Sequence, residues 1–314
     1  MRIIIPILLI ISMTFLIAGC GEEEMPVEEL KAFIGGAKGI DIELTEQAPP
    51  DIVYDMDFPF DINVKVANVG EWDIDNSNDL TLTIIGIEPE SFGKTLSQLT
   101  KNSDIPLNGA HYDPQNNVVE GTITNINFPT FQYQQPIVGS IELPVVARVC
   151  YEYGTKVNTK ICVLDDLLGV SRRLGEEPVC NPNENKKAEN SGAPVQITSF
   201  RESVVAADRI SFTFEISHIG EGSIARMDTE CSTTIADKDK VWVKINTGIN
   251  GLTCSGIEAG SSEGFTTLYT GKRTIICTQP LDSPRGDYAK PIAIELQYGY
   301  TELVSKTLTV RHTG

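Results

Sequence analysis

The chain has little positive charge and few of the side chains that usually carry chemistry. Its 314 residues include 25 Lys and Arg against 43 Asp and Glu, a net charge of −18, with only three histidines and two tryptophans. The acidic surface that this composition predicts would repel phosphate backbones and anionic lipid surfaces. We therefore expect no nucleic-acid partner.

Motifs for catalysis and metal binding are also scarce. The sequence has no H-E-x-x-H, no phosphate-binding G-x-x-x-x-G-K-[ST], no G-x-G-x-x-G and no C-x-x-C or C-x-x-H spacing. It also lacks an N-x-S/T glycosylation site. The three histidines, His111, His218 and His312, stand apart in turn-like sequence, and we interpret them as solvated loop residues. We expect no catalytic residues and no cofactor.

What the chain does have begins at its N-terminus. Met1-Arg2 supplies a positive charge, Ile3 to Ile17 are mostly apolar, and Ala18-Gly19 are small, which is the layout of a secretory signal. The end of this segment, Leu16-Ile17-Ala18-Gly19-Cys20, resembles the lipobox of prokaryotic lipoproteins. The resemblance implies a signal peptide at 1–19, cleavage after Gly19 and a lipid on the thiol of Cys20.

An uncleaved helical anchor is the alternative. Residues 3–19 are at the lower edge of the length that can span a bilayer. In both cases the protein reaches the membrane through an N-terminal lipid or helix. The positive-inside rule then places the acidic tether at 20–33 outside, and we expect a cell-membrane protein on the extracytoplasmic face.

The exported part is dominated by two-residue periodicity and contains a repeat. Phe60 to Glu71 aligns without gaps on Ile210 to Glu221, and Val149-Cys-Tyr-Glu-Tyr on Leu296-Gln-Tyr-Gly-Tyr. Gly70 precedes Tyr151 by 81 residues, and Gly220 precedes Tyr298 by 78. Two motifs recurring in order at nearly equal spacing indicate a tandem duplication.

Short strands with turn residues between them predict an all-β protein of two tandem immunoglobulin-like β-sandwich domains. We place them at 34–174 and 193–314, with a polar linker at 175–192. Within each domain the repeated glycine is expected to supply a positive φ at a turn. The tyrosines are expected to fill the core between the sheets.

The repeat also carries a resemblance. The pattern F-x-I-x-V-x-V-x-N-x-G at Phe60 to Gly70, after Pro49-Pro50, resembles immunoglobulin-like modules of the cell-adhesion-related type in archaeal and bacterial surface proteins. Phe33 to Ile40 and the pair Cys150 and Cys162 are similar to exported proteins of small-genome archaea. The second copy departs by having His218 in place of the asparagine. The resemblance implies a fold and no particular chemistry.

Six cysteines remain when Cys20 is set aside, and disulfides are expected in an exported protein. Cys150 and Cys162 flank a possible hairpin near Lys156, and Cys254 and Cys277 bracket a glycine-rich segment. These two pairs leave Cys180 with Cys231.

One polar loop has the character of a cation site. Asp73, Asp75 and Asp79 alternate as oxygen ligands do in a Ca²⁺-binding loop. The central glycine and the final glutamate of that pattern are missing here, so we favour a solvated acidic loop over a calcium site.

These features together predict a membrane-anchored exported surface protein with a binding, adhesion or spacer role, whose partner is a surface protein or a glycan. The long segments Glu90 to Asn117 and Glu221 to Lys240 are the expected binding loops. One alternative is an exported hydrolase, or a carbohydrate-binding accessory module, that uses a carboxylate pair. A second alternative is an envelope or fibre subunit that pairs through its edge strands.

Overall fold

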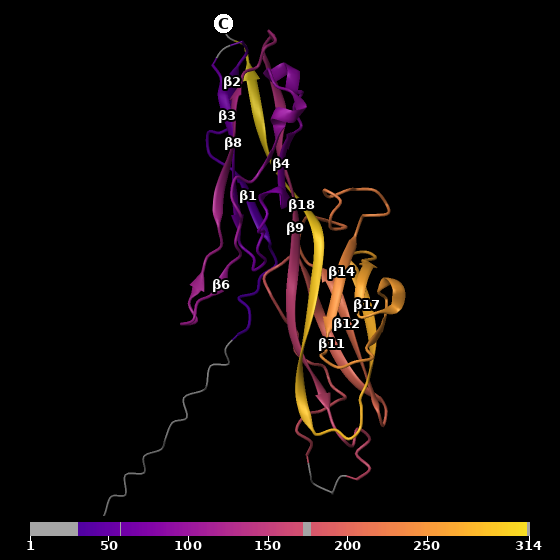
Figure 1. The fold of residues 1–314 in the computed structure, drawn as a ribbon. Coiled ribbons are helices and arrows are strands. Elements are labelled where there is room, and N and C mark those ends of the chain that lie inside the picture. Colours follow the sequence, from indigo (N-terminus) through magenta and orange to yellow (C-terminus); the bar gives the residue numbers. More distant parts are fainter. Residues whose placement is uncertain (1–30, 57, 172–176, 313–314) are drawn as a thin grey trace, which may run out of the picture. The chain divides into compact units, whose positions relative to one another are not determined.

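The computed structural model describes residues 31–56, 58–171 and 177–312 and shows an all-β protein (Figure 1). The predictions for the signal segment, for Cys20 and for most of the tether lie outside these residues. In the described part, no helix is long and apolar enough to cross a membrane. The helical pieces there are the short 3₁₀ turns η1 (Ser77–Asp79), η2 (Pro89–Phe92), η3 (Leu96–Leu99) and η4 (Glu258–Gly260).

The first repeat contributes nine strands. They are β1 (Ile40–Leu44), β2 (Ile52–Tyr54), β3 (Phe60–Asn68), β4 (Leu80–Ile85), β5 (Thr100–Asn102), β6 (His111–Tyr112), β7 (Val118–Val119), β8 (Ile123–Phe131) and β9 (Ser140–Val163). The remaining strands are β10 (Glu189–Asn190), β11 (Val195–Ala206), β12 (Arg209–His218), β13 (Ser223–Ala225), β14 (Lys240–Asn246), β15 (Thr253–Ser255), β16 (Glu263–Thr267), β17 (Lys272–Pro280) and β18 (Tyr288–Arg311).

The two copies of the sequence repeat occupy matching places. The first copy of its opening motif forms β3, between β1 and β8, and the second forms β12, between β11 and β17. Both are antiparallel to their neighbours. On each strand, alternate side chains are fully buried, such as Ile62 and Val64 on β3 and Phe212 and Phe214 on β12. This alternation is typical of sheets that bury one face.

The two repeats share a third sheet, in which β9 and β18 lie at the centre. These two 24-residue strands pair antiparallel along their whole length, from Ser140 opposite Arg311 to Val163 opposite Tyr288. The first part of β9 pairs with β4 of its own repeat, and the first part of β18 pairs with β14 of the second repeat. Each long strand then continues into the other repeat, as Figure 1 shows.

This sheet corrects the predicted domain organisation. Residues 32–314 form one compact unit, and the repeats are joined by two long strands and not only by a linker at 175–192. Part of that segment is itself built into the fold, because Glu189 and Asn190 form β10 against β9. The amide of Ser191 also donates to the carbonyl of Lys156 at 2.8 Å.

The repeated glycine has a different role from the one predicted. Neither Gly70 nor Gly220 has a positive φ; instead each makes room for a tyrosine. A Cβ on Gly70 would lie 2.2 Å from the hydroxyl oxygen of Tyr153, and a Cβ on Gly220 would lie 2.4 Å from that of Tyr300. The two sequence motifs, about 80 residues apart, therefore contact each other in both copies. Burial of the tyrosine rings is confirmed, since Tyr153 and Tyr300 are at most 1% exposed.

The cysteines form three disulfides, of which one was predicted correctly. Cys254 pairs with Cys277 on the neighbouring strands β15 and β17. The predicted bonds Cys150–Cys162 and Cys180–Cys231 are wrong, and Cys150–Cys231 and Cys162–Cys180 form in their place. Cys150 and Cys162 lie on the single strand β9, about 40 Å apart at about 3.3 Å per residue. A disulfide cannot bridge that distance.

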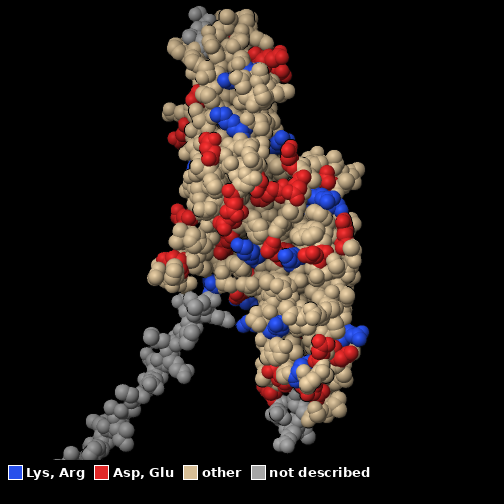
Figure 2. Space-filling model, in the orientation of Figure 1, with Lys and Arg blue, Asp and Glu red and all other residues tan. Residues whose placement is uncertain are grey.

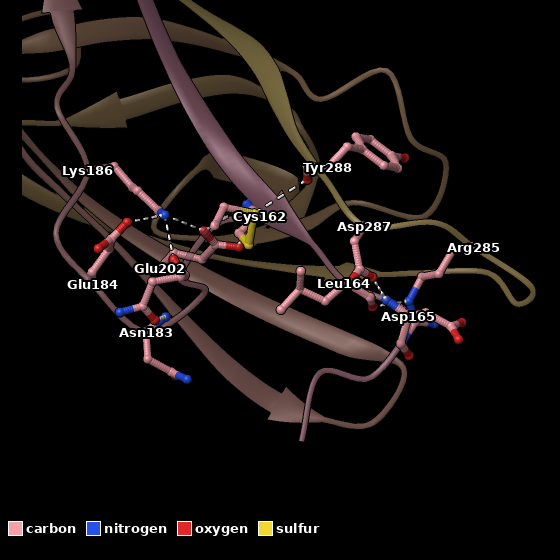
Figure 3. Close-up of a disulfide and its surroundings, with 12 residues drawn as sticks. Cys162, Leu164, Asp165, Asn183, Glu184, Lys186, Glu202, Arg285, Asp287 and Tyr288 are labelled. Carbon is pink, nitrogen blue, oxygen red and sulfur yellow. Dashed lines mark hydrogen bonds and ion pairs between the residues drawn. A yellow bond between two sulfur atoms is a disulfide. The ribbon is translucent and has the colours of Figure 1, made fainter. Parts of the chain in front are cut away.

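A buried carboxylate lies beside the Cys162–Cys180 bond (Figure 3). Glu202 on β11 is fully buried and accepts the amide of Cys162 with both oxygens, at 3.0 and 2.9 Å. The ammonium of Lys186 lies 3.6 Å from Glu202 and 2.6 Å from the exposed Glu184. Burial raises the pKa of Glu202 from 4.5 to about 7, although the Cys162 amide and Lys186 act in the opposite direction.

This pKa predicts a pH-dependent stability. Between pH 4.5 and 7 the folded state holds a proton on Glu202 that the unfolded chain releases, so the free energy of unfolding falls as pH rises through this window. The full shift corresponds to about 3 kcal/mol. Denaturant titrations should show that Glu202→Gln flattens this fall, whereas Glu184→Gln, altering the other carboxylate near Lys186, should retain it. An unchanged slope in Glu202→Gln would assign the dependence elsewhere.

Candidate functional site

The centre of the shared sheet carries a cavity. We call the point where Glu152 of β9 pairs with Gly299 of β18 the junction. A cavity of about 360 Å³ lies there. It is lined by Trp72, Asp73, Asp75, Asn76, Asp79, Glu152, Tyr153, Lys156, Met227, Asp228 and Gln297. Its walls come from both repeats, namely the loop between β3 and β4 and the loop between β13 and β14.

Trp72 lies against β9 because the strand has a glycine beneath it. A Cβ on Gly154 would lie 2.6 Å from atoms of the Trp72 ring. Two residues further along β9, the ammonium of Lys156 lies 5.4 Å from the ring centre of Trp72. Gly154 therefore serves a close approach within a strand, as glycines in strand interiors often do.

Glu152 is a half-buried carboxylate of the cavity. Burial raises its pKa from 4.5 to about 7, and the nearby charges of Asp228 and Asp79 act in the same direction. The amide of Asp228, which donates to Glu152 Oε1 at 2.9 Å, opposes the shift. The cavity therefore gains negative charge as pH rises through about 7.

The predicted calcium ligands all line this cavity, but they do not form a metal site. Asp73 Oδ1 accepts the amide of Gly109 at 2.7 Å, so it is engaged in holding a neighbouring loop. Within the described residues, no group of three or more His, Cys, Asp or Glu side chains could hold a metal ion. The loop of Asp73, Asp75 and Asp79 contributes charge to the cavity and not a coordination sphere.

A second cavity, of about 420 Å³, adjoins the first. It is lined by Arg226, Met227, Asp228, Thr229, Asp237, Trp242 and Phe265, so Met227 and Asp228 belong to both cavities. Trp242 and Phe265 pack edge to face with ring centres 4.9 Å apart, and both are half-buried. The guanidinium carbon of Arg226 lies 4.3 Å from the Phe265 ring centre. We call the two cavities together the junction groove.

Carboxylates outnumber cations in the junction groove, which has six of the former and two of the latter. Figure 2 shows Asp and Glu side chains gathered over the middle of the visible face, at the level where β9, β18 and β14 are labelled in Figure 1. The groove thus combines aromatic surface with a strong negative field, which low-dielectric walls intensify.

One of the two predicted binding loops lines the junction groove, and the other does not. The segment from Glu221 to Lys240 supplies Arg226 to Thr229 and Asp237 to the groove. Glu90 to Asn117 supplies no lining residue. The loop after β13 is fastened to β9 by the Cys150–Cys231 disulfide.

Sequence reasoning missed Trp72, Glu152, Lys156 and Trp242, although a signal for them existed. In the alignment of the repeats, Trp72 falls on Gly222 and Glu152 falls on Gly299. Shared residues such as Tyr153 build the fold and also reach the groove, whereas Trp72 and Glu152 stand where the second copy has glycine. Trp242, the chain's other tryptophan, lies outside the aligned motifs.

The histidines lie away from the groove. His111 is exposed on β6. His218 was predicted to be a solvated turn residue, but it ends β12 half-buried, with Nε2 2.8 Å from the Tyr300 hydroxyl. Burial lowers the pKa of His218. His312 lies 2.8 Å from the buried carboxylate of Asp55.

Comparison with known proteins adds no functional assignment. No protein-family model matches the chain, and no curated protein shows significant similarity to it.

Proposed function

We propose that this is an exported, membrane-tethered binding protein that presents the junction groove to a partner on the cell surface. The observation that carries the proposal is the groove itself, formed where the repeats meet and lined by both tryptophans. Half-buried aromatic residues enriched in one concave surface are typical of binding sites. The signal-like N-terminus and Cys20 support export and lipid anchoring.

The point at which the tether joins the fold supports the same proposal. The amides of Ile34 and Gly35 both donate to the carboxylate of Glu71 at 2.8 Å, and the amide of Gly192 donates to it at 2.6 Å. Glu71 precedes Trp72 of the groove. Glu71, in the turn after β3, thus holds the start of the folded unit and the segment before β11 in place. These contacts fix the backbone next to Trp72 of the groove.

The hydrolase alternative has one observation in its favour, which is Glu152. That hypothesis expected two carboxylates with a raised pKa in one cleft. Burial also raises the pKa values of Glu202 and Glu302, but neither residue lines the cavity of Glu152. A binding role is therefore the better-supported reading.

The lattice alternative requires edge strands that are free to pair. At the edge strand β8, the ammonium groups of Lys101 and Lys94 donate to the carbonyls of Asn127 and Pro129, each at 2.7 Å. Lysines placed in this way hinder strand addition. Binding through the groove does not need a free edge.

The anchoring step is tested by metabolic labelling with a lipid precursor. The wild-type chain is expected to incorporate the label and to fractionate with membranes, and Cys20→Ala is expected to lose the label completely. A thiol is the nucleophile that such modification needs, and serine is the matched control because it retains shape but not the thiol. Label retained in Cys20→Ala or Cys20→Ser would overturn lipid anchoring.

A further inference from the structure

Each cavity of the junction groove contains an aromatic ring that is in contact with a cationic side chain of the chain itself. Lys156 lies over Trp72 in one cavity, and Arg226 lies over Phe265 in the other. Cations bind aromatic faces through the ring quadrupole, and the attraction grows when the site is partly desolvated. In each cavity, therefore, one of the chain's own cationic side chains already occupies an aromatic face. A cation from a ligand could bind the same face.

The carboxylates that line the groove also favour a cationic ligand. Asp75, Asp79 and Asp228 surround the first cavity, and Asp228 and Asp237 flank the second. Lys156 and Arg226 are too few to neutralise these carboxylates. An anionic ligand would meet net repulsion. A neutral sugar could donate hydroxyl hydrogen bonds to the carboxylates but would leave their charge uncompensated, whereas a cationic ligand gains from both the rings and the rim.

The arrangement of the two cavities indicates the size of the ligand. They are adjacent and share Met227 and Asp228 as a common wall. Two neighbouring subsites suit two cationic side chains on one extended segment better than one small cation. Met227 is an adaptable side chain that suits contact with a flexible partner.

We propose that the junction groove binds a basic segment of a partner protein, with successive Lys or Arg side chains entering its two cavities. The inference rests on the proposed binding function and specifies its ligand. Arg226 and Lys156 then act as internal competitors, because each occupies a ring face that an incoming cation would use.

Because of this competition, removing a cation from the groove should increase its affinity for a basic peptide. The full-length chain in detergent is titrated against a fluorescein-labelled peptide of alternating lysine and glycine, and binding is followed by fluorescence anisotropy. We expect Arg226→Ala to tighten binding about threefold, since a competing cation is removed. Trp242→Ala should weaken it about tenfold or more, as loss of an aromatic anchor does, and Trp242→Phe should recover most of the affinity.

Lys65→Ala is the matched control for net charge. Lys65 is on β3, in the three-stranded sheet, and does not line the groove. The Lys65→Ala substitution removes the same charge as Arg226→Ala, but it should change the affinity for the basic peptide much less. A peptide of alternating glutamate and glycine should not bind.

Weaker binding in Arg226→Ala, equal gains in Lys65→Ala, or an unchanged affinity in Trp242→Ala would each overturn the proposal. Because Arg226 is exposed, its alanine variant should stay folded, and a melting curve of the variant checks this. The lipid-labelling experiment does not involve the groove. A chain that is labelled but binds no basic peptide would therefore refute the ligand class and leave the tethered location intact.

Discussion

Replacing Cys150 and Cys231 together by serine is expected to lower the free energy of unfolding by about 4 to 5 kcal/mol. The bond closes a loop of 81 residues and fastens β9 to the loop that carries Asp228. Loop-closure entropy gives this magnitude for a cross-link of that span. The loss should appear as a lower denaturation midpoint in guanidinium chloride with a somewhat steeper slope, because the unfolded chain is less compact without the cross-link.

The Cys162–Cys180 bond is the internal control, because it closes only 18 residues. Its double serine variant should lose about 3 kcal/mol, less than the longer loop. Peptide mapping without reduction should recover Cys150 joined to Cys231. Recovery of Cys150 joined to Cys162, or a larger loss from the shorter loop, would contradict these disulfide pairings.

The long disulfide also bears on the groove. Asp228, Glu230 and Cys231 all have positive φ, between 49° and 59°, which is uncommon for residues other than glycine. The surroundings must hold such a loop in place. The bond to Cys150 supplies one such restraint, so the double serine variant should loosen the wall that separates the two cavities.

Strand content and the repeat could be predicted from sequence because both depend on local pattern. Alternating side chains reveal which residues lie in strands, and matching spacing reveals the duplication. Pattern does not reveal which strands pair. The segment around Lys156 was interpreted as a hairpin, whereas it lies within the single strand β9, where Gly154 admits the ring of Trp72. That misreading accounts for the wrong bond between Cys150 and Cys162.

The groove was harder to predict for the same reason. Asp73, Asp75 and Asp79 were identified as an unusual acidic loop, but nothing local connects them with Glu152 or with Asp228. The connection comes from the pairing of β9 with β18, which brings loops of both repeats to one point. Cys254–Cys277 was predictable because its partners are on strands that are close in the sequence.

The shared strands also predict how the protein responds to being divided. We expect that fragments 32–174 and 175–314, produced separately, will not fold cooperatively. In the second fragment Tyr288 to Gly299 would lose pairing with Glu152 to Val163, and in the first the start of β9 would lose the end of β18. Each fragment would expose a long central strand edge, with many unpaired backbone groups and access to the core.

Produced together, the same fragments should associate, because β9 and β18 can pair again between chains and the Cys150–Cys231 and Cys162–Cys180 bonds can both form between them. Co-purification and a single melting transition, followed by circular dichroism, are the expected results. An intact chain cleaved between 174 and 175 after folding is the control, and it should remain associated after reduction of Cys150–Cys231 and Cys162–Cys180, which both cross the cut. If each fragment instead melted cooperatively alone, near the temperature of the intact chain, the repeats would be independent domains. The pairing of β9 with β18 would then contribute little to the stability of either.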